Sequence, residues 1–167
     1  RGSVFQDQYP AFSANLSGDV DISSTGWRDL TGWNEEYDLS SDFNAATTGI
    51  FEAPVKGIYH FHLQISLYDL DEEISTIILR FNNTGGTDYG ARFDMDEVYY
   101  TGAAGSADTE SHPFTLTRTL KLEEGDRVNP QLYIDDETGK IDGGSRTTSG
   151  KAHTDTFFEG HLITALN

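Results

Sequence analysis

The sequence contains no cysteine, which excludes disulfide bonds, thiolate metal sites and a cysteine nucleophile. It also lacks any run of about 18 apolar residues, so no segment has the composition of a membrane-spanning helix. Basic residues are scarce, with 11 Lys and Arg against 28 Asp and Glu, and the net charge is −17. Because this charge repels nucleic-acid phosphates and anionic lipids, we expect no nucleic-acid binding and no membrane insertion.

Helical periodicity is absent as well, since no window keeps apolar residues at helical spacing for more than two turns. Apolar and polar residues alternate instead, most clearly from Ile58 to Tyr68 and again from Thr76 to Phe81. This period of two predicts strands with one face in a core. Stretches rich in Gly, Asp, Asn, Ser and Thr at 82–89, 101–111 and 135–151 predict loops. The sequence therefore predicts an all-β sandwich or jelly roll.

The chain has the length of one domain, which buries about 70% of its unfolded surface without cross-links. We expect residues 1–10 to be a loose N-terminal lead, in which Arg1-Gly2-Ser3 is a remnant of cloning. Residues 11–167 then form one domain, with no internal repeat and no linker.

The segment from Phe43 to Leu63 carries the most specific motif. Pro54 cannot donate a ladder hydrogen bond and Gly57 can adopt a positive φ, so the pair predicts a short turn between two strands. The segment resembles the F-x-A-P-x-x-G-x-Y-x-F motif of the complement C1q and tumour necrosis factor superfamily. The matching residues are Phe51, Ala53, Pro54, Gly57, Tyr59 and Phe61.

Three further segments resemble the same superfamily, in the expected order. Ala11 to Ala14 is similar to its first strand, Leu120 to Val128 contains its L-x-x-G-D-x-V turn, and Phe158 to Leu162 resembles its closing F-x-G-x-L strand. The resemblance implies a jelly-roll β-sandwich that forms a homotrimer and serves as a binding head, not as an enzyme.

Two positions depart from the family pattern. Leu63 stands where an aromatic residue is usual, and the aromatic expected before Gly49 corresponds to Phe43, one position out of register. The segment from Trp27 to Trp33 resembles bacterial and viral relatives more than vertebrate ones. We therefore expect a distant branch, and no ligand of an animal member is carried over.

The sequence has 20 aromatic residues, as 10 Phe, 8 Tyr and 2 Trp, and aromatic side chains are favoured both in cores and between subunits. We expect Tyr59, Tyr133, Phe157 and Phe158 to contribute to the core or to the trimer axis, as the resemblance implies for Tyr59 and Phe158. Ordinary packing within one chain explains each of them equally well.

Three other aromatic residues, Trp27, Trp33 and Tyr37, are candidates for ligand binding. Exposed aromatic rings stack on sugars and on apolar patches. The alternative for each is a buried position at a strand edge.

Clusters of carboxylates are candidates for a hard cation, because calcium takes six to eight oxygen ligands from flexible loops. The clusters lie at 69–73, 94–97 and 135–142, and none matches a helical calcium-binding loop. We select Asp135 and Asp136, since loops near the apex of family trimers bind calcium in some members. A solvated acidic loop is the alternative.

His60 and His62 lie two residues apart on a predicted strand, so both imidazoles project from one face. Such a pair is able to share a metal ion, with His161, Glu159 or a symmetry copy as the third ligand. The alternative is a polar face toward solvent or a neighbouring subunit.

Enzyme signatures are missing: there is no G-x-S-x-G elbow and no phosphate-binding loop. We predict a trimeric, non-catalytic head on an extracellular or particle-surface fibre of a cell, spore or virus, binding surface glycans or proteins multivalently. The alternatives are a trimerisation cap without a ligand and a monomeric carbohydrate-binding sandwich.

Overall fold

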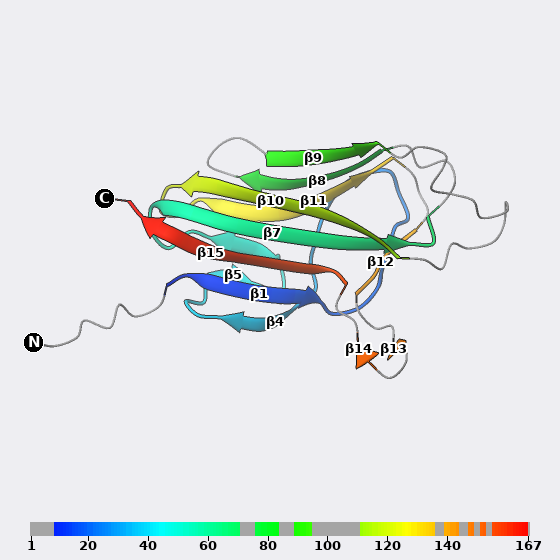
Figure 1. Cartoon of the computed structure of the whole chain (residues 1–167), viewed down its shortest axis with the longest axis horizontal. Helices are drawn as coiled ribbons and strands as arrows, with labels where there is room; N and C mark the ends of the chain where they lie inside the picture. The colour runs from blue at the N-terminus through cyan, green and yellow to red at the C-terminus, as the bar shows by residue number, and fades with distance from the viewer. Residues whose placement is uncertain are drawn as a thin grey trace, which may run out of the picture.

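The computed structural model describes residues 9–70, 76–83, 89–94, 111–135, 139–143, 147–148, 151–152 and 155–166. They form two antiparallel sheets that pack face to face, and β1 begins where β15 ends, at one end of the sandwich (Figure 1). None of these residues forms a helix, so the described chain offers no helix that could cross a membrane.

Sheet A has seven strands. They are β1 (Ala11–Leu16), β2 (Val20–Asp21), β4 (Trp33–Asp38), β7 (Gly57–Tyr68), β10 (His112–Leu122), β12 (Lys140–Ile141) and β15 (Phe157–Ala165). Sheet B has six strands. They are β3 (Gly26–Asp29), β5 (Phe43–Asn44), β6 (Ile50–Glu52), β8 (Thr76–Asn83), β9 (Tyr89–Asp94) and β11 (Arg127–Ile134), and a separate pair joins β13 (Thr147–Thr148) to β14 (Lys151–Ala152).

Strand β7 is the centre of sheet A, where it pairs with both β10 and β15. The side chains at its odd positions from Tyr59 to Leu67 are fully buried, whereas His60, His62 and Gln64 point to the opposite face. On β8, Ile77, Leu79 and Phe81 are fully buried too. Both predicted alternations are confirmed.

Aromatic rings fill the core between the sheets. The ring of Phe12 on β1 lies 4.4 Å from that of Phe43 and 5.3 Å from that of Phe51, centroid to centroid. Phe158 on β15 joins them, 4.9 Å from Phe12 and 6.0 Å from Phe61. These rings come from both sheets, so the aromatic cluster holds the two layers together.

The predicted turn around Pro54 joins β6 in sheet B to β7 in sheet A, so it carries the chain from one sheet to the other. Our expectation of a positive φ at Gly57 is wrong, because its backbone is not in that region. A side chain there would instead lie 2.5 Å from Cδ1 of Leu162 and 2.9 Å from the carbonyl oxygen of Thr164. Close packing against β15 is the reason for this glycine.

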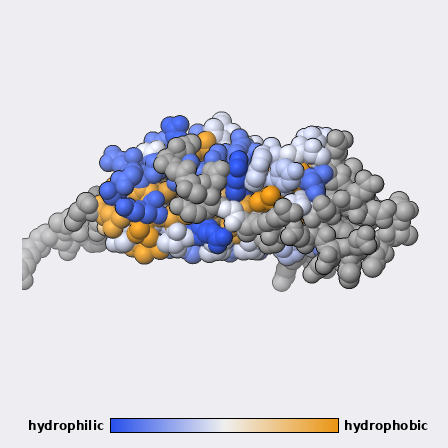
Figure 2. Space-filling view, turned by 90° about the horizontal axis from the view of Figure 1, so that it is seen from above, coloured by the Kyte–Doolittle hydropathy of each residue, from blue (hydrophilic) through white to orange (hydrophobic). Residues whose placement is uncertain are grey.

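Two predicted loops contain strand residues. Tyr89 begins β9, and Lys140 and Ile141 form β12, which pairs with the end of β7. On the face seen in Figure 2, hydrophobic side chains gather toward the end where β1 begins, with hydrophilic side chains beside them.

Candidate binding sites

A pocket of about 1240 Å³ lies beside β4, β5 and β6. Its wall follows a loop shaped by short side chains: the carboxylate of Asp38 accepts hydrogen bonds from the backbone N–H groups of Ser40 and Phe43, and Asn44 accepts two from Thr47. Such local bonds to backbone fix the turns without a helix or a strand. The loop therefore has a defined shape.

Trp33 is one of the residues that line this pocket, and its indole N–H donates to the carbonyl oxygen of Leu30 at 2.8 Å. Gly49, at φ +65°, makes room for the ring, since a side chain there would lie 2.6 Å from the indole nitrogen. The tryptophan is only 4% exposed, so its position is set by the fold and not by a ligand.

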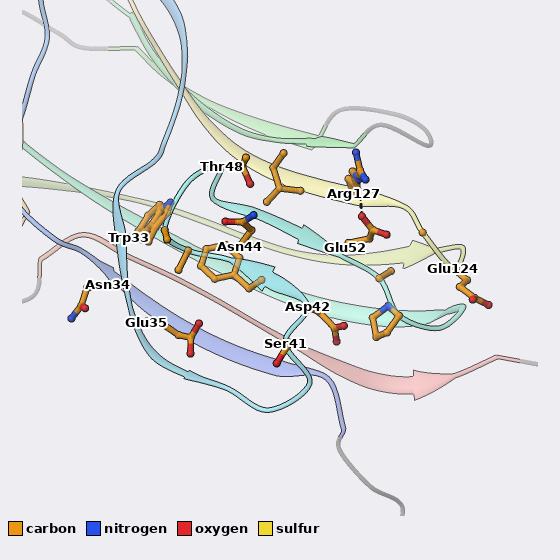
Figure 3. A pocket seen from close by; sticks show the side chains of 17 residues that line it. Trp33, Asn34, Glu35, Ser41, Asp42, Asn44, Thr48, Glu52, Glu124 and Arg127 are labelled. Carbon is orange, nitrogen blue, oxygen red and sulfur yellow. Dashed lines mark hydrogen bonds and ion pairs between the residues drawn. The ribbon is translucent and has the colours of Figure 1, made fainter.

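The pocket lining is acidic. It contains four carboxylates and one guanidinium (Figure 3): Glu35, Asp42, Glu52, Glu124 and Arg127. Nε of Arg127 lies 2.8 Å from Oε2 of Glu52. Amide and hydroxyl groups complete the lining, from Asn34, Ser41, Asn44 and Thr48. This mixture of donors and acceptors beside an aromatic wall suits a polyhydroxylated or cationic ligand.

Asp42 is the least satisfied carboxylate of the pocket. Its Oδ2 is buried without a hydrogen-bond partner. Burial raises the pKa of Asp42 above 3.8, and although the Ser40 side chain acts in the opposite direction, the nearby charges of Asp38 and Glu52 add to the rise. A hydrogen-bond donor or cation in the pocket would stabilise this oxygen.

A second candidate surface lies on the outer side of sheet B, around Trp27, whose side chain is 43% exposed. The guanidinium carbon of Arg80 lies 3.7 Å from the centroid of the indole ring, and the ring of Tyr133 lies 5.4 Å from it. A cation over an indole is attracted by the negative face of the ring.

Beneath this ring, a hydrogen-bond ladder crosses three strands. Nε of Arg80 donates to Oε1 of Gln131 at 2.6 Å, and Nε2 of Gln131 donates to Oδ1 of Asp29. Asn129 donates to the same oxygen at 2.7 Å. We call these six residues the Trp27 platform: Trp27, Asp29, Arg80, Asn129, Gln131 and Tyr133. Its ladder holds an exposed ring in one place.

A third candidate is the outward side of sheet A, here called the sheet A face. Its outward positions on β1, β7, β10 and β15 alternate with the buried ones. They are Ser13, Asn15, Ile58, His60, His62, Gln64, Thr115, Thr117, Thr119, Lys121, Phe157, Glu159, His161 and Ile163. Among these positions Glu159 is the single carboxylate, in a chain with 28, and on the neighbouring edge strand β4 Glu36 accepts a hydrogen bond from Asn15 at 2.6 Å.

Solved structures with the same fold are found although neither protein-family models nor curated protein sequences match the chain. The globular domain of a zebrafish complement 1qA protein is 18% identical, with a TM-score of 0.61 over 94% of this chain and 99% of that one. The Eiger tumour necrosis factor of S. frugiperda is 13% identical, with a TM-score of 0.60 over 95% of both chains. Murine APRIL is 11% identical, with a TM-score of 0.58 over 93% of this chain and all of that one.

The chain has the C1q and tumour necrosis factor-like fold. The predicted fold class, an all-β jelly roll, is confirmed, and so is the resemblance on which it was based. At these identities the likeness concerns the fold alone, so the predicted bacterial or viral branch stays a prediction.

Within this C1q-like fold, the three aromatic residues selected for ligand binding have different surroundings. Trp27 and Tyr37 are 43% and 47% exposed. Trp33 is buried, so it lacks the exposed ring face on which its selection was based, although it borders the pocket. Alternation does not separate Trp33 from Tyr37, because the two lie four residues apart in β4 and would share a face, whereas the burial of Trp33 depends on its packing against Leu30 and Gly49.

The four aromatic residues selected for the core or the trimer axis divide in the same way. Tyr59 and Phe158 are fully buried, and the hydroxyl of Tyr59 donates to the carbonyl oxygen of Val55 at 2.7 Å. Burial raises the pKa of Tyr59. Phe157 and Tyr133 are half-buried, on the sheet A face and in the Trp27 platform respectively. In the C1q-like fold the first two are core residues.

The calcium prediction remains untested. Oδ1 of Asp135 accepts a hydrogen bond from the backbone N–H of Thr76 at 3.0 Å, and Asp136 lies outside the described residues. Across the described ranges, no three His, Asp or Glu side chains converge as a metal site.

Proposed function

We propose that this chain is a non-catalytic, homotrimeric recognition head, displayed on an extracellular or particle-surface fibre and binding surface glycans or proteins. The observation that carries the proposal is the C1q-like fold along 94% of the chain. Three equal sites on one rigid head raise avidity by about 10² to 10⁴ over a single weak contact when the target repeats.

The sheet A face is the surface we assign to the trimer contact. Each chain carries a net charge of −17, so any interface must avoid placing carboxylates opposite each other. On β1, β7, β10 and β15 this face has one carboxylate, Glu159, which lies 3.2 Å from Nδ1 of His62, and the edge strand β4 adds Glu36, which accepts a hydrogen bond from Asn15. Phe157 and Ile163 add apolar area to this face. Depletion of charge and presence of aromatic residues are features of interface cores.

The Trp27 platform is the surface we assign to glycan or protein recognition. Its indole is exposed yet held by Arg80 and Tyr133, so little side-chain entropy is lost when a ligand stacks on it. Asp29 beside it is exposed, and its carboxylate is able to accept hydrogen bonds from hydroxyls. A planar ring next to such groups is the arrangement that binds a sugar's apolar face and its hydroxyl rim.

Two rival functions make different predictions. A trimerisation cap without a ligand would be a trimer whose Trp27 platform binds nothing. A carbohydrate-binding module would be a monomer that binds soluble oligosaccharides with one site and no avidity. Measuring both the molar mass and the binding of oligosaccharides distinguishes the recognition head from the trimerisation cap and from the monomeric module.

The deciding experiment is absolute molar mass by light scattering on a sizing column, in calcium and in a chelator. The proposal expects three times the chain mass of 18.5 kDa. A monomer in both buffers would contradict it. Loss of mass or of thermal stability in the chelator alone would support a structural calcium ion at Asp135 and Asp136. Binding is then measured on an oligosaccharide array with wild type and Trp27→Ala.

A further inference from the structure

We propose that His60 and His161 together bind one divalent transition-metal ion, Zn²⁺ or Cu²⁺, on the sheet A face. The two residues are directly opposite in the antiparallel pairing of β7 with β15. Side chains at opposite positions start about 5 Å apart and project to the same side of the sheet. The fold thus brings together two imidazoles that are 101 positions apart in the sequence.

The separation of the two rings fits a shared ion. Their centroids lie 5.3 Å apart and their planes meet at 45°. A tetrahedral zinc ion binds imidazole nitrogen at about 2.0 Å, which places the centroids of two bound rings about 5 Å apart. With the observed spacing, rotation of the two imidazole rings is enough to bring a nitrogen of each to one metal ion, and the backbone does not have to move.

Thr119 on β10 orients one of the two ligands. Its Oγ1 lies 3.4 Å from Nδ1 of His60, on the neighbouring strand. When Nδ1–H donates to this hydroxyl, Nε2 keeps its lone pair for the metal. Metal-binding histidines commonly use their second nitrogen in this way, and the partner fixes both tautomer and ring orientation.

The next pair along the two strands supplies a negative charge. Glu159 lies opposite His62 and its Oε1 is 3.2 Å from Nδ1 of that ring. Since no group of three His, Asp or Glu side chains converges within the described residues, water completes the coordination. Two nitrogen ligands favour Zn²⁺ and Cu²⁺ over Ca²⁺ and Mg²⁺, which prefer oxygen.

Both ligands come from one chain, so the site does not require the proposed trimer. A chain that stays monomeric would still present the two rings, and a trimer without the metal would still be a recognition head. Where copies pack on the sheet A face, the open coordination positions of the ion lie at their interface.

The test is a calorimetric titration of Zn²⁺ into protein stripped with a chelator, with magnesium in excess to occupy acidic surface groups. We expect one saturable zinc per chain. His60→Gln and His161→Gln should each weaken binding by more than about tenfold, and Thr119→Val by about tenfold, because it removes the orienting hydroxyl. Light scattering on the same samples reports the assembly separately.

His112→Gln is the matched control, because His112 lies on β10 seven positions from Thr119, about 23 Å along the strand. It should leave zinc binding unchanged. In wild type, Cu²⁺ should broaden the imidazole NMR signals of His60 and His161 before that of His112, a result that needs no variant to fold. Absence of saturable zinc binding, or binding that survives both His60→Gln and His161→Gln, would overturn the proposal in either assembly state.

Discussion

Gly160 lies directly opposite Phe61, and the phenyl ring of Phe61 occupies the space that a side chain at position 160 would need. A Cβ there would lie 2.6 Å from Cδ1 of Phe61 and 2.7 Å from Cε1 of Phe12. The glycine of the closing strand is thus a requirement of the aromatic core. It lets β7 and β1 bring the rings of Phe61 and Phe12 under β15.

Gly160→Ala should therefore destabilise the domain by about 1–3 kcal/mol, the usual cost of overpacking a core. Gly18→Ala is the control, because nothing lies within 4 Å of a Cβ at that position. Urea unfolding of both variants measures the difference in free energy. Equal stability of the two would show that the ring of Phe61 does not lie where we place it.

The neighbours Phe157 and Phe158 should separate assembly from folding. Phe158 is fully buried among Phe12, Phe43 and Phe61, so Phe158→Ala should cost about 3–5 kcal/mol of unfolding free energy. Phe157 is half-buried on the sheet A face, so Phe157→Ala should leave the folded chain intact and lower the molar mass seen by light scattering. A Phe157→Ala protein that stays fully trimeric at low micromolar concentration would argue against the assigned interface.

Much of the fold could be predicted because alternation is a local signal. The buried odd positions of β7 follow from a period of two in the sequence alone. The candidate sites depend on pairing between distant strands, which alternation does not determine. Arg127 meets Glu52 only because β11 pairs with β6, and His161 meets His60 only because β15 pairs with β7. The close packing of Gly57 is beyond a local pattern for the same reason, since its packing partner Leu162 lies far along the chain.

The two tryptophans should respond in opposite ways to truncation. Trp27→Ala removes an exposed ring, so we expect little change in thermal unfolding and a loss of binding on the oligosaccharide array. Trp33→Ala empties a buried site and should cost about 3–5 kcal/mol of stability. If Trp27→Ala keeps full array binding while it remains folded and trimeric, the Trp27 platform is not the recognition surface.

A salt-bridged carboxylate stabilises a folded protein more as the pH rises through its pKa. The raised pKa of Asp42 predicts the opposite, namely a contribution to stability that becomes less favourable as the pH rises. Because burial raises its folded pKa above 3.8, the ionised form is penalised in the folded state, and this penalty is complete only at pH values above the raised pKa. Asp42→Asn removes the charge, so it should stabilise the protein at about pH 7 by a few tenths of a kcal/mol, a small gain because the group is only partly buried.

As the pH falls toward 3.8, wild-type Asp42 becomes protonated and the advantage of Asp42→Asn should disappear. Urea midpoints at about pH 7 and about pH 4 measure the trend, with Glu124→Gln as a control at the exposed rim of the same pocket. An Asp42→Asn protein that is less stable than wild type at neutral pH would mean that Oδ2 has a partner in the folded protein. In that case the unsatisfied oxygen that favours a donor or cationic ligand in this pocket would not exist.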